Sequence, residues 1–193
     1  TRGSAPRDFS YSNNLIPSVI ICGRKSPPFT IRSIQKKHEV ISQPDLRWGR
    51  CDIKSVSLLA ATMAKQCALE VGADETWMFD QNGFVTEGTS SNAWIVSGNK
   101  QLITKGTDTS ILPGITRQRI INLAKYCKID VIERPFSIQE VLASSEAFCS
   151  SSTFPIKPVV KFDSHKVGDG KIGPITKLLI KNYLKYLGNI GDK

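Results

Sequence analysis

A lysine and a glutamate stand where their side chains could act on a small molecule. Lys54 ends the segment Asp52-Ile53-Lys54, directly before a predicted helix. The positive end of a helix disfavours the protonated amine, and so does partial burial. A lysine in that state can form a Schiff base with an aldehyde. The alternative interpretation is a solvated lysine at the start of a helix.

Glu87 lies in the segment VTEGTSSN, at the predicted end of a strand. A carboxylate at this position can hold a cationic ring nitrogen through a charge-assisted hydrogen bond. It can equally cap the turn that follows, by accepting hydrogen bonds from backbone N–H groups. The residue types alone leave both roles open.

Two further segments offer groups that bind anions. Gly114-Ile115-Thr116 places backbone N–H groups and a hydroxyl at a predicted helix N-terminus, where anions are stabilised. Ser150 to Thr153 form a second, hydroxyl-rich segment. Ordinary capping and turn formation explain each segment taken singly. Taken together, a Schiff-base amine, a carboxylate for a pyridinium nitrogen and two phosphate-binding segments are the groups that a pyridoxal-phosphate (PLP) site needs.

The elements that must position these residues are predicted from the spacing of apolar residues, glycines and prolines. Strands are predicted at 18–22, 39–42, 75–79, 84–87, 92–96, 102–104, 129–134, 147–150 and 156–162. Helices are predicted at 55–71, from about 115, at 138–142 and after Gly173-Pro174. Several strands are joined as hairpins, one of them through Asn82-Gly83. The sequence therefore predicts an α/β fold with a mixed sheet and helices packed on it.

The composition limits the classes of partner. The chain has 193 residues, a net charge of +9 and 40% hydrophobic residues, enough for a sizeable core. Its basic residues are dispersed, and Lys177, Lys181 and Lys185 recur at the spacing of a solvated helix face. We therefore expect no nucleic-acid partner, although a basic surface can attract small anionic substrates. No apolar run approaches the roughly 20 residues of a membrane helix, so we expect a cytoplasmic protein without a membrane partner.

Metal and disulfide chemistry have little support. The chain holds two histidines and five cysteines without CxxC spacing, which favours neither a metal site nor a disulfide framework. His38 and His165 have no evident partner and are expected at the surface. Cys51 is expected to be a buried structural thiol, and the three tryptophans are expected in core or interface packing.

Three segments occur in the order DLRWGRCDIKS, VTEGTSSN and ILPGITR, preceded by TRGSAPRD and followed by SSTFPIKPVVKFD. In this order and spacing they resemble the class IV aminotransferases of PLP fold type IV, and within that family the D-amino-acid aminotransferases. The resemblance implies the large C-terminal, PLP-binding domain of this fold over residues 31–193. Residues 1–30 then form a connecting segment of the interdomain region, and the smaller N-terminal domain of the family is expected to be absent.

The resemblance also implies roles for single residues. Lys54 matches the lysine that holds PLP as an internal aldimine and later moves a proton between Cα and C4′. Glu87 matches the carboxylate beside the ring nitrogen, and Leu112 matches the residue packed on the ring face. The implied phosphate-binding residues are Ile115, Thr116, Ser152 and Thr153.

Arg7 matches the arginine that receives the substrate carboxylate across the interface of a homodimer, where its bidentate geometry suits the ligand. The histidine of the family's PRxH pattern is replaced by Phe9, which cannot donate a hydrogen bond to a carboxylate. The implied activity is PLP-dependent transamination of D-amino acids of the D-alanine type, with a 2-oxo acid as acceptor. The alternatives are a branched-chain L-amino-acid aminotransferase, an aminodeoxychorismate lyase and a truncated fragment without activity.

Overall fold

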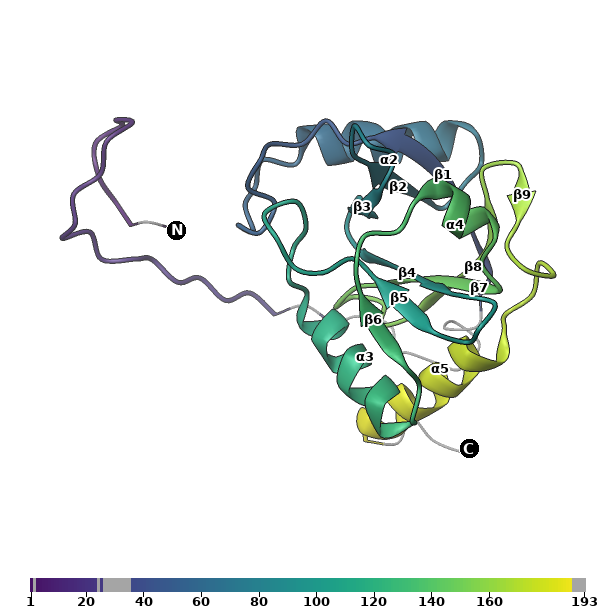
Figure 1. Cartoon of the computed structure of the whole chain (residues 1–193). Coiled ribbons are helices and arrows are strands. Elements are labelled where there is room, and N and C mark those ends of the chain that lie inside the picture. The colour runs from purple at the N-terminus through teal and green to yellow at the C-terminus, as the bar shows by residue number, and fades with distance from the viewer. Residues whose placement is uncertain (2, 24, 26–35, 189–193) are drawn as a thin grey trace.

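A mixed sheet of nine strands forms the centre of the computed structural model, which describes residues 1, 3–23, 25 and 36–188 (Figure 1). This confirms the predicted α/β fold. The strands are β1 (His38–Pro44), β2 (Glu75–Phe79), β3 (Val85–Gly88), β4 (Asn92–Val96), β5 (Leu102–Thr104), β6 (Val131–Glu133), β7 (Glu146–Ser150), β8 (Lys157–Phe162) and β9 (His165–Lys166). The helices are α2 (Leu59–Glu70), α3 (Ile115–Tyr126), α4 (Ile138–Leu142) and α5 (Pro174–Tyr186).

The sheet order is β3-β2-β1-β8-β7-β4-β5-β6, with β9 paired to β8. β1 runs parallel to both β2 and β8, and β5 runs parallel to β6. The remaining pairs are antiparallel. The parallel pairing of β1 with β8 joins strands that are far apart in the sequence.

Strand β4 shows how the sheet is buried on both faces. Trp94 and Val96 pack in a core with residues of α3 and α5, which lie side by side in Figure 1. Ala93 and Ile95 pack in a second core, which includes Trp77 of β2. Successive side chains of a strand point to opposite faces, so an uninterrupted apolar run supplies both cores.

Two predicted elements differ from the structure. The helix predicted from Ser55 begins at Leu59. The backbone N–H of Ser57 bonds to the Ser55 hydroxyl at 3.2 Å, and such local bonds compete with helix formation. The predicted strand at 18–22 is not formed. Its aliphatic side chains are at least 80% exposed, and a strand needs a paired neighbour to stay ordered.

His38 was expected at the surface but is buried, 7% exposed. Its ring lies edge-on to Phe154 and 3.5 Å from the carboxylate of Asp74. Burial lowers the pKa of the imidazole, although the negative charge of Asp74 acts in the opposite direction. The proposed boundary between residues 30 and 31 falls within 26–35, outside the described residues.

Within the described part of the chain, no helix has both the length and the hydropathy needed to cross a membrane. The same residues contain no group of three or more His, Cys, Asp or Glu side chains placed to bind a metal ion.

Candidate active site

A cavity of about 640 Å³ opens where the loop between β1 and α2 meets the end of β3, the start of α3 and the end of β7. Six of the eight residues selected from the sequence line this cavity: Lys54, Glu87, Leu112, Ile115, Thr116 and Ser152. Arg7 and Thr153 are exposed and are not among the residues described as lining it. The tertiary structure therefore brings together residues that span nearly 100 positions of the sequence.

Lys54 lies in the loop between β1 and α2, and its side chain is exposed at the cavity. The loop is anchored by a hydrogen bond from the Cys51 N–H to the carbonyl oxygen of Thr109, at 2.7 Å. Because α2 begins only at Leu59, Lys54 is not at the helix terminus. Its amine is therefore available to a molecule in the cavity through exposure rather than through the field of the helix.

A second residue of this loop differs from expectation. Cys51 is half-buried on the cavity wall, where its thiol donates to the Trp48 carbonyl oxygen at 3.2 Å. Burial raises the pKa of the Cys51 thiol. Trp48 is 51% exposed and lines the same cavity, whereas Trp77 and Trp94 are fully buried as predicted.

Glu87 is a buried carboxylate at the inner wall of the cavity, 5% exposed. Its Oε1 accepts from Nη1 of Arg47 at 2.5 Å, and its Oε2 accepts from Nδ2 of Asn92 at 3.0 Å. The N–H of Leu112 lies 3.2 Å from both oxygens. Burial raises the pKa of Glu87 to about 7, while the positive charge and hydrogen bond of Arg47 act in the opposite direction. Arg47 thus opposes the protonation of Glu87 that burial favours.

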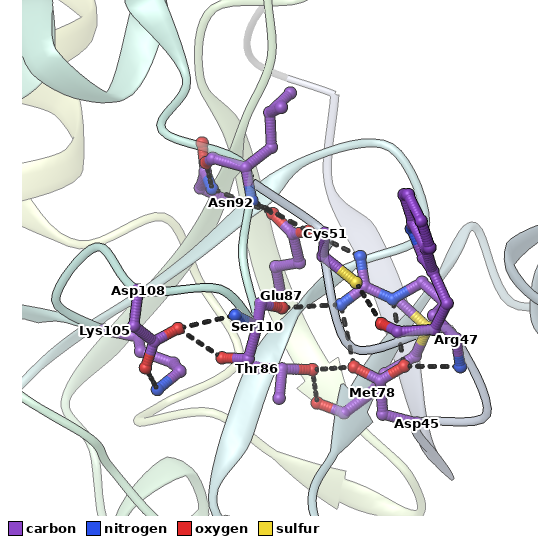
Figure 2. A network of polar contacts seen from close by, with 12 residues as sticks. Asp45, Arg47, Cys51, Met78, Thr86, Glu87, Asn92, Lys105, Asp108 and Ser110 are labelled. Carbon is purple, nitrogen blue, oxygen red and sulfur yellow. Dashed lines mark hydrogen bonds and ion pairs between the residues drawn. The ribbon is translucent and has the colours of Figure 1, made fainter. Parts of the chain in front are cut away.

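Arg47 connects Glu87 to a second acidic residue (Figure 2). Its Nε and Nη2 donate to the two carboxylate oxygens of Asp45 at 2.9 and 2.7 Å, and Nη2 also donates to the Ser110 carbonyl oxygen at 3.1 Å. The Thr86 hydroxyl donates to Asp45 at 2.7 Å. Burial tends to raise the pKa of Asp45, but the hydrogen bonds from Arg47 and Thr86 outweigh it and keep this pKa below its usual range.

The opposite end of the cavity can bind an anion. Gly114 is the N-cap of α3, and no side chain caps this terminus. The first N–H groups of a helix have no partner inside it and carry partial positive charge. Ile115 and Thr116 supply these groups at the cavity. Ser152 faces the same space from the loop after β7, where Ser151 closes a turn by bonding to Phe154.

Sequence reasoning missed Arg47, Asp45 and Asn92 as site residues. All three lie within or beside quoted motifs, DLRWGRCDIKS and VTEGTSSN. A signal was present, because Asp45 and Arg47 have opposite charges two positions apart after an apolar strand. Their partner Glu87 is 40 residues from Arg47, so the pattern alone could not connect them.

An exposed amine, a buried carboxylate and an uncapped helix N-terminus therefore share one cavity. Such a set can hold an aromatic ring that carries an aldehyde, a basic ring nitrogen and a phosphate. The residues present fit PLP, because each polar part of that molecule has a matching group in this chain.

Comparison with known proteins supports this description. The family "Amino-transferase class IV" matches residues 1–162. A D-alanine aminotransferase from Bacillus licheniformis is 37% identical over 181 residues, which cover 92% of this chain and 62% of that protein. A D-alanine aminotransferase from Staphylococcus haemolyticus is 34% identical over 187 residues, covering 97% and 66%. The chain thus spans somewhat less than two thirds of the length of these relatives.

A similar solved structure is the branched-chain amino acid aminotransferase from Thermobaculum terrenum in its PLP-form. It superposes with a TM-score of 0.77 at 26% sequence identity. The match covers 83% of this chain and 54% of the other.

Proposed function

Because this chain belongs to the class IV aminotransferase family, we propose that it binds pyridoxal 5′-phosphate through Lys54. We further propose that it transfers amino groups from a D-amino acid of the D-alanine type to a 2-oxo acid. The observation that carries this proposal is that Lys54, the buried Glu87 and the N-terminus of α3 all line one cavity.

In this proposal, different residues of the cavity bind different parts of the cofactor. The N–H groups of Ile115 and Thr116, with the hydroxyl of Ser152, would bind the phosphate. Leu112 packs against one face of the ring. Glu87 accepts a hydrogen bond from the protonated ring nitrogen, and an ionised carboxylate there keeps that nitrogen protonated.

When bound, the cofactor accepts the electron pair that is released as the substrate loses its Cα proton. Lys54 would hold the cofactor through its aldehyde carbon, and the Lys54 amine would serve as the group that moves the proton between Cα and C4′. Arg47 opposes the neutralisation of Glu87 by burial and so favours the ionised carboxylate that the ring nitrogen needs.

The cofactor assignment is tested by adding PLP to the purified 193-residue chain and recording the absorbance spectrum. We expect a visible band that borohydride bleaches, with one pyridoxyl group attached to Lys54 by peptide mapping. A chain without an adduct, or with adducts scattered over exposed lysines, contradicts the proposal.

The substrate assignment depends on Arg7, for which we propose a role in binding the substrate carboxylate of a second protomer in a homodimer. Its neighbour Phe9 is fully exposed and supplies no hydrogen bond there. With 2-oxoglutarate as acceptor, we expect pyruvate to form faster from D-alanine than from L-alanine. Faster transfer from L-valine or L-leucine would instead indicate a branched-chain L-amino-acid aminotransferase.

A further inference from the structure

Asn92, the first residue of β4, lies between the two ends of the cavity. Its side chain is buried, with the residue 6% exposed. Its Nδ2 donates to Glu87 Oε2 and to the carbonyl oxygen of Leu112, both at 3.0 Å. Figure 2 shows Asn92 directed at Glu87. A single amide group therefore links the buried carboxylate to the segment that leads into α3.

The other contacts of Asn92 reach the anion-binding end of the cavity. A Cβ atom at Gly114 would lie 2.4 Å from Asn92 Oδ1, so the carboxamide is packed against the N-cap of α3. In the sheet, the backbone of Asn92 is paired with Ser150, the first residue of the hydroxyl-rich segment. Three segments that line the cavity thus meet at one residue.

We propose that Asn92 is a positioning residue, which holds Glu87 and the N-terminus of α3 at the spacing that one ligand needs in order to bind both. This inference rests on the proposed function, in which Glu87 meets the ring nitrogen and α3 meets the phosphate. Asn92 acts through these groups. An amide suits the position because it donates to a carboxylate without adding charge beside Glu87, Arg47 and Asp45.

The substitution Asn92→Asp preserves the shape of the side chain and removes the donor. At pH 8 the new carboxylate cannot donate to Glu87 and repels it, so we expect the dissociation constant for PLP to rise about 10- to 100-fold over wild type. At pH 5.5, burial and the neighbouring charge keep the new group protonated. Its single O–H can then restore one of the two hydrogen bonds that Asn92 Nδ2 donates, so we expect the ratio of variant to wild-type dissociation constants to fall by about threefold or more from its value at pH 8.

If the dissociation constants of Asn92→Asp and wild type for PLP are nearly equal at both pH values, Asn92 only fills space and the inference is wrong. The matched control is Asn99→Asp, in the exposed turn after β4 and outside this cavity. The dissociation constant of Asn99→Asp for PLP should stay close to that of the wild type at both pH values. Comparing variant and wild type at the same pH removes every effect of pH that the two proteins share.

A second measurement needs no cofactor and also covers the case in which Asn92→Asp fails to fold. The folding equilibrium constant is measured for Gly114→Ala, Asn92→Ala and the double variant. Because the new methyl group collides with the Asn92 carboxamide, Gly114→Ala should lower this constant about tenfold or more in the wild type. In the Asn92→Ala background, Gly114→Ala should lower the folding equilibrium constant less than about threefold. If Gly114→Ala lowers the folding equilibrium constant by the same factor in both backgrounds, Asn92 and Gly114 are not coupled and the inference is wrong.

The two proposals can fail separately. If the wild-type chain forms no adduct at Lys54, the proposed function fails, while the unfolding cycle still decides whether Asn92 couples to α3. If the wild type binds PLP and Asn92→Asp shows no pH-dependent loss, only the role of Asn92 is refuted.

Discussion

Replacing Lys54 with alanine is expected to abolish the pyridoxyl adduct that remains after borohydride reduction. It is also expected to lower the transamination rate by about 10²- to 10⁴-fold or more. General acid–base groups contribute rate factors of this size, and the covalent attachment is lost as well. Lys54 is exposed and precedes α2, so the free energy of unfolding should change by less than about 0.5 kcal/mol. Mass spectrometry of the reduced protein and a coupled rate assay measure the two effects.

Lys65 provides the matched control for this variant. It lines the same cavity, but its amine donates to the carbonyl oxygen of Asp74 and lies 3.9 Å from Glu75. Lys65→Ala should therefore keep the adduct on Lys54. An adduct that persists in Lys54→Ala would show that another amine attacks the aldehyde. Lys54→Arg, which keeps the positive charge, should be as inactive as the alanine variant if the nucleophile matters rather than the charge.

Replacing Arg47 with methionine is expected to have the largest effect on stability. The change leaves the carboxylates of Asp45 and Glu87 buried without the cation between them. Breaking a buried ion pair by removing one partner costs about 3–5 kcal/mol, and we expect a loss of this size in the free energy of unfolding at pH 8. Chemical denaturation at several pH values measures it.

The loss should shrink as the pH falls from 8 to 5. Burial already places the pKa of Glu87 at about 7 in the wild type, above its ordinary value, and the variant removes the lowering effect of Arg47. A carboxyl group whose pKa is raised by folding binds more protons in the folded than in the unfolded state. Stability therefore falls as the pH rises through this window in the wild type as well. The additional loss in the variant comes from the further rise in the pKa of Glu87 and from Asp45, whose pKa is no longer lowered by Arg47. A destabilisation that is equal at pH 5 and pH 8 would contradict this account.

Arg50→Met is the control for the arginine variant. Arg50 lies in the same loop and pairs with Asp52, but its side chain is 54% exposed. Exposed ion pairs contribute little to stability, so this variant should unfold almost as the wild type does at both pH values.

The residues with a reactive group or a special backbone role could be predicted from the sequence. Lys54, Glu87 and Gly114 each stand in a short motif whose residue types allow a chemical role, and the order of these motifs along the chain favours that role. The helices at 115–126 and 138–142 were also accessible, because capping and periodicity act between residues a few positions apart. The error at the start of α2 has the same origin, since the local bonds of Ser55 and Ser57 compete with the helix on the same short range.

The contacts that set the burial and the charge pairing of Glu87 could not be predicted in this way. Its partners Arg47 and Leu112 are 40 and 25 residues away. Arg47 follows β1, which only β2 separates from β3, the strand of Glu87, so the order of the strands brings this pair together. The sequence by itself determined which groups could carry the chemistry and which segments could be helix or strand, because these depend on residue type and near neighbours. Only the tertiary structure decided that Glu87 is buried against Arg47, that Lys54 is exposed and that Asn92 joins the two ends of the cavity. Burial and charge pairing depend on which distant segments the sheet brings together.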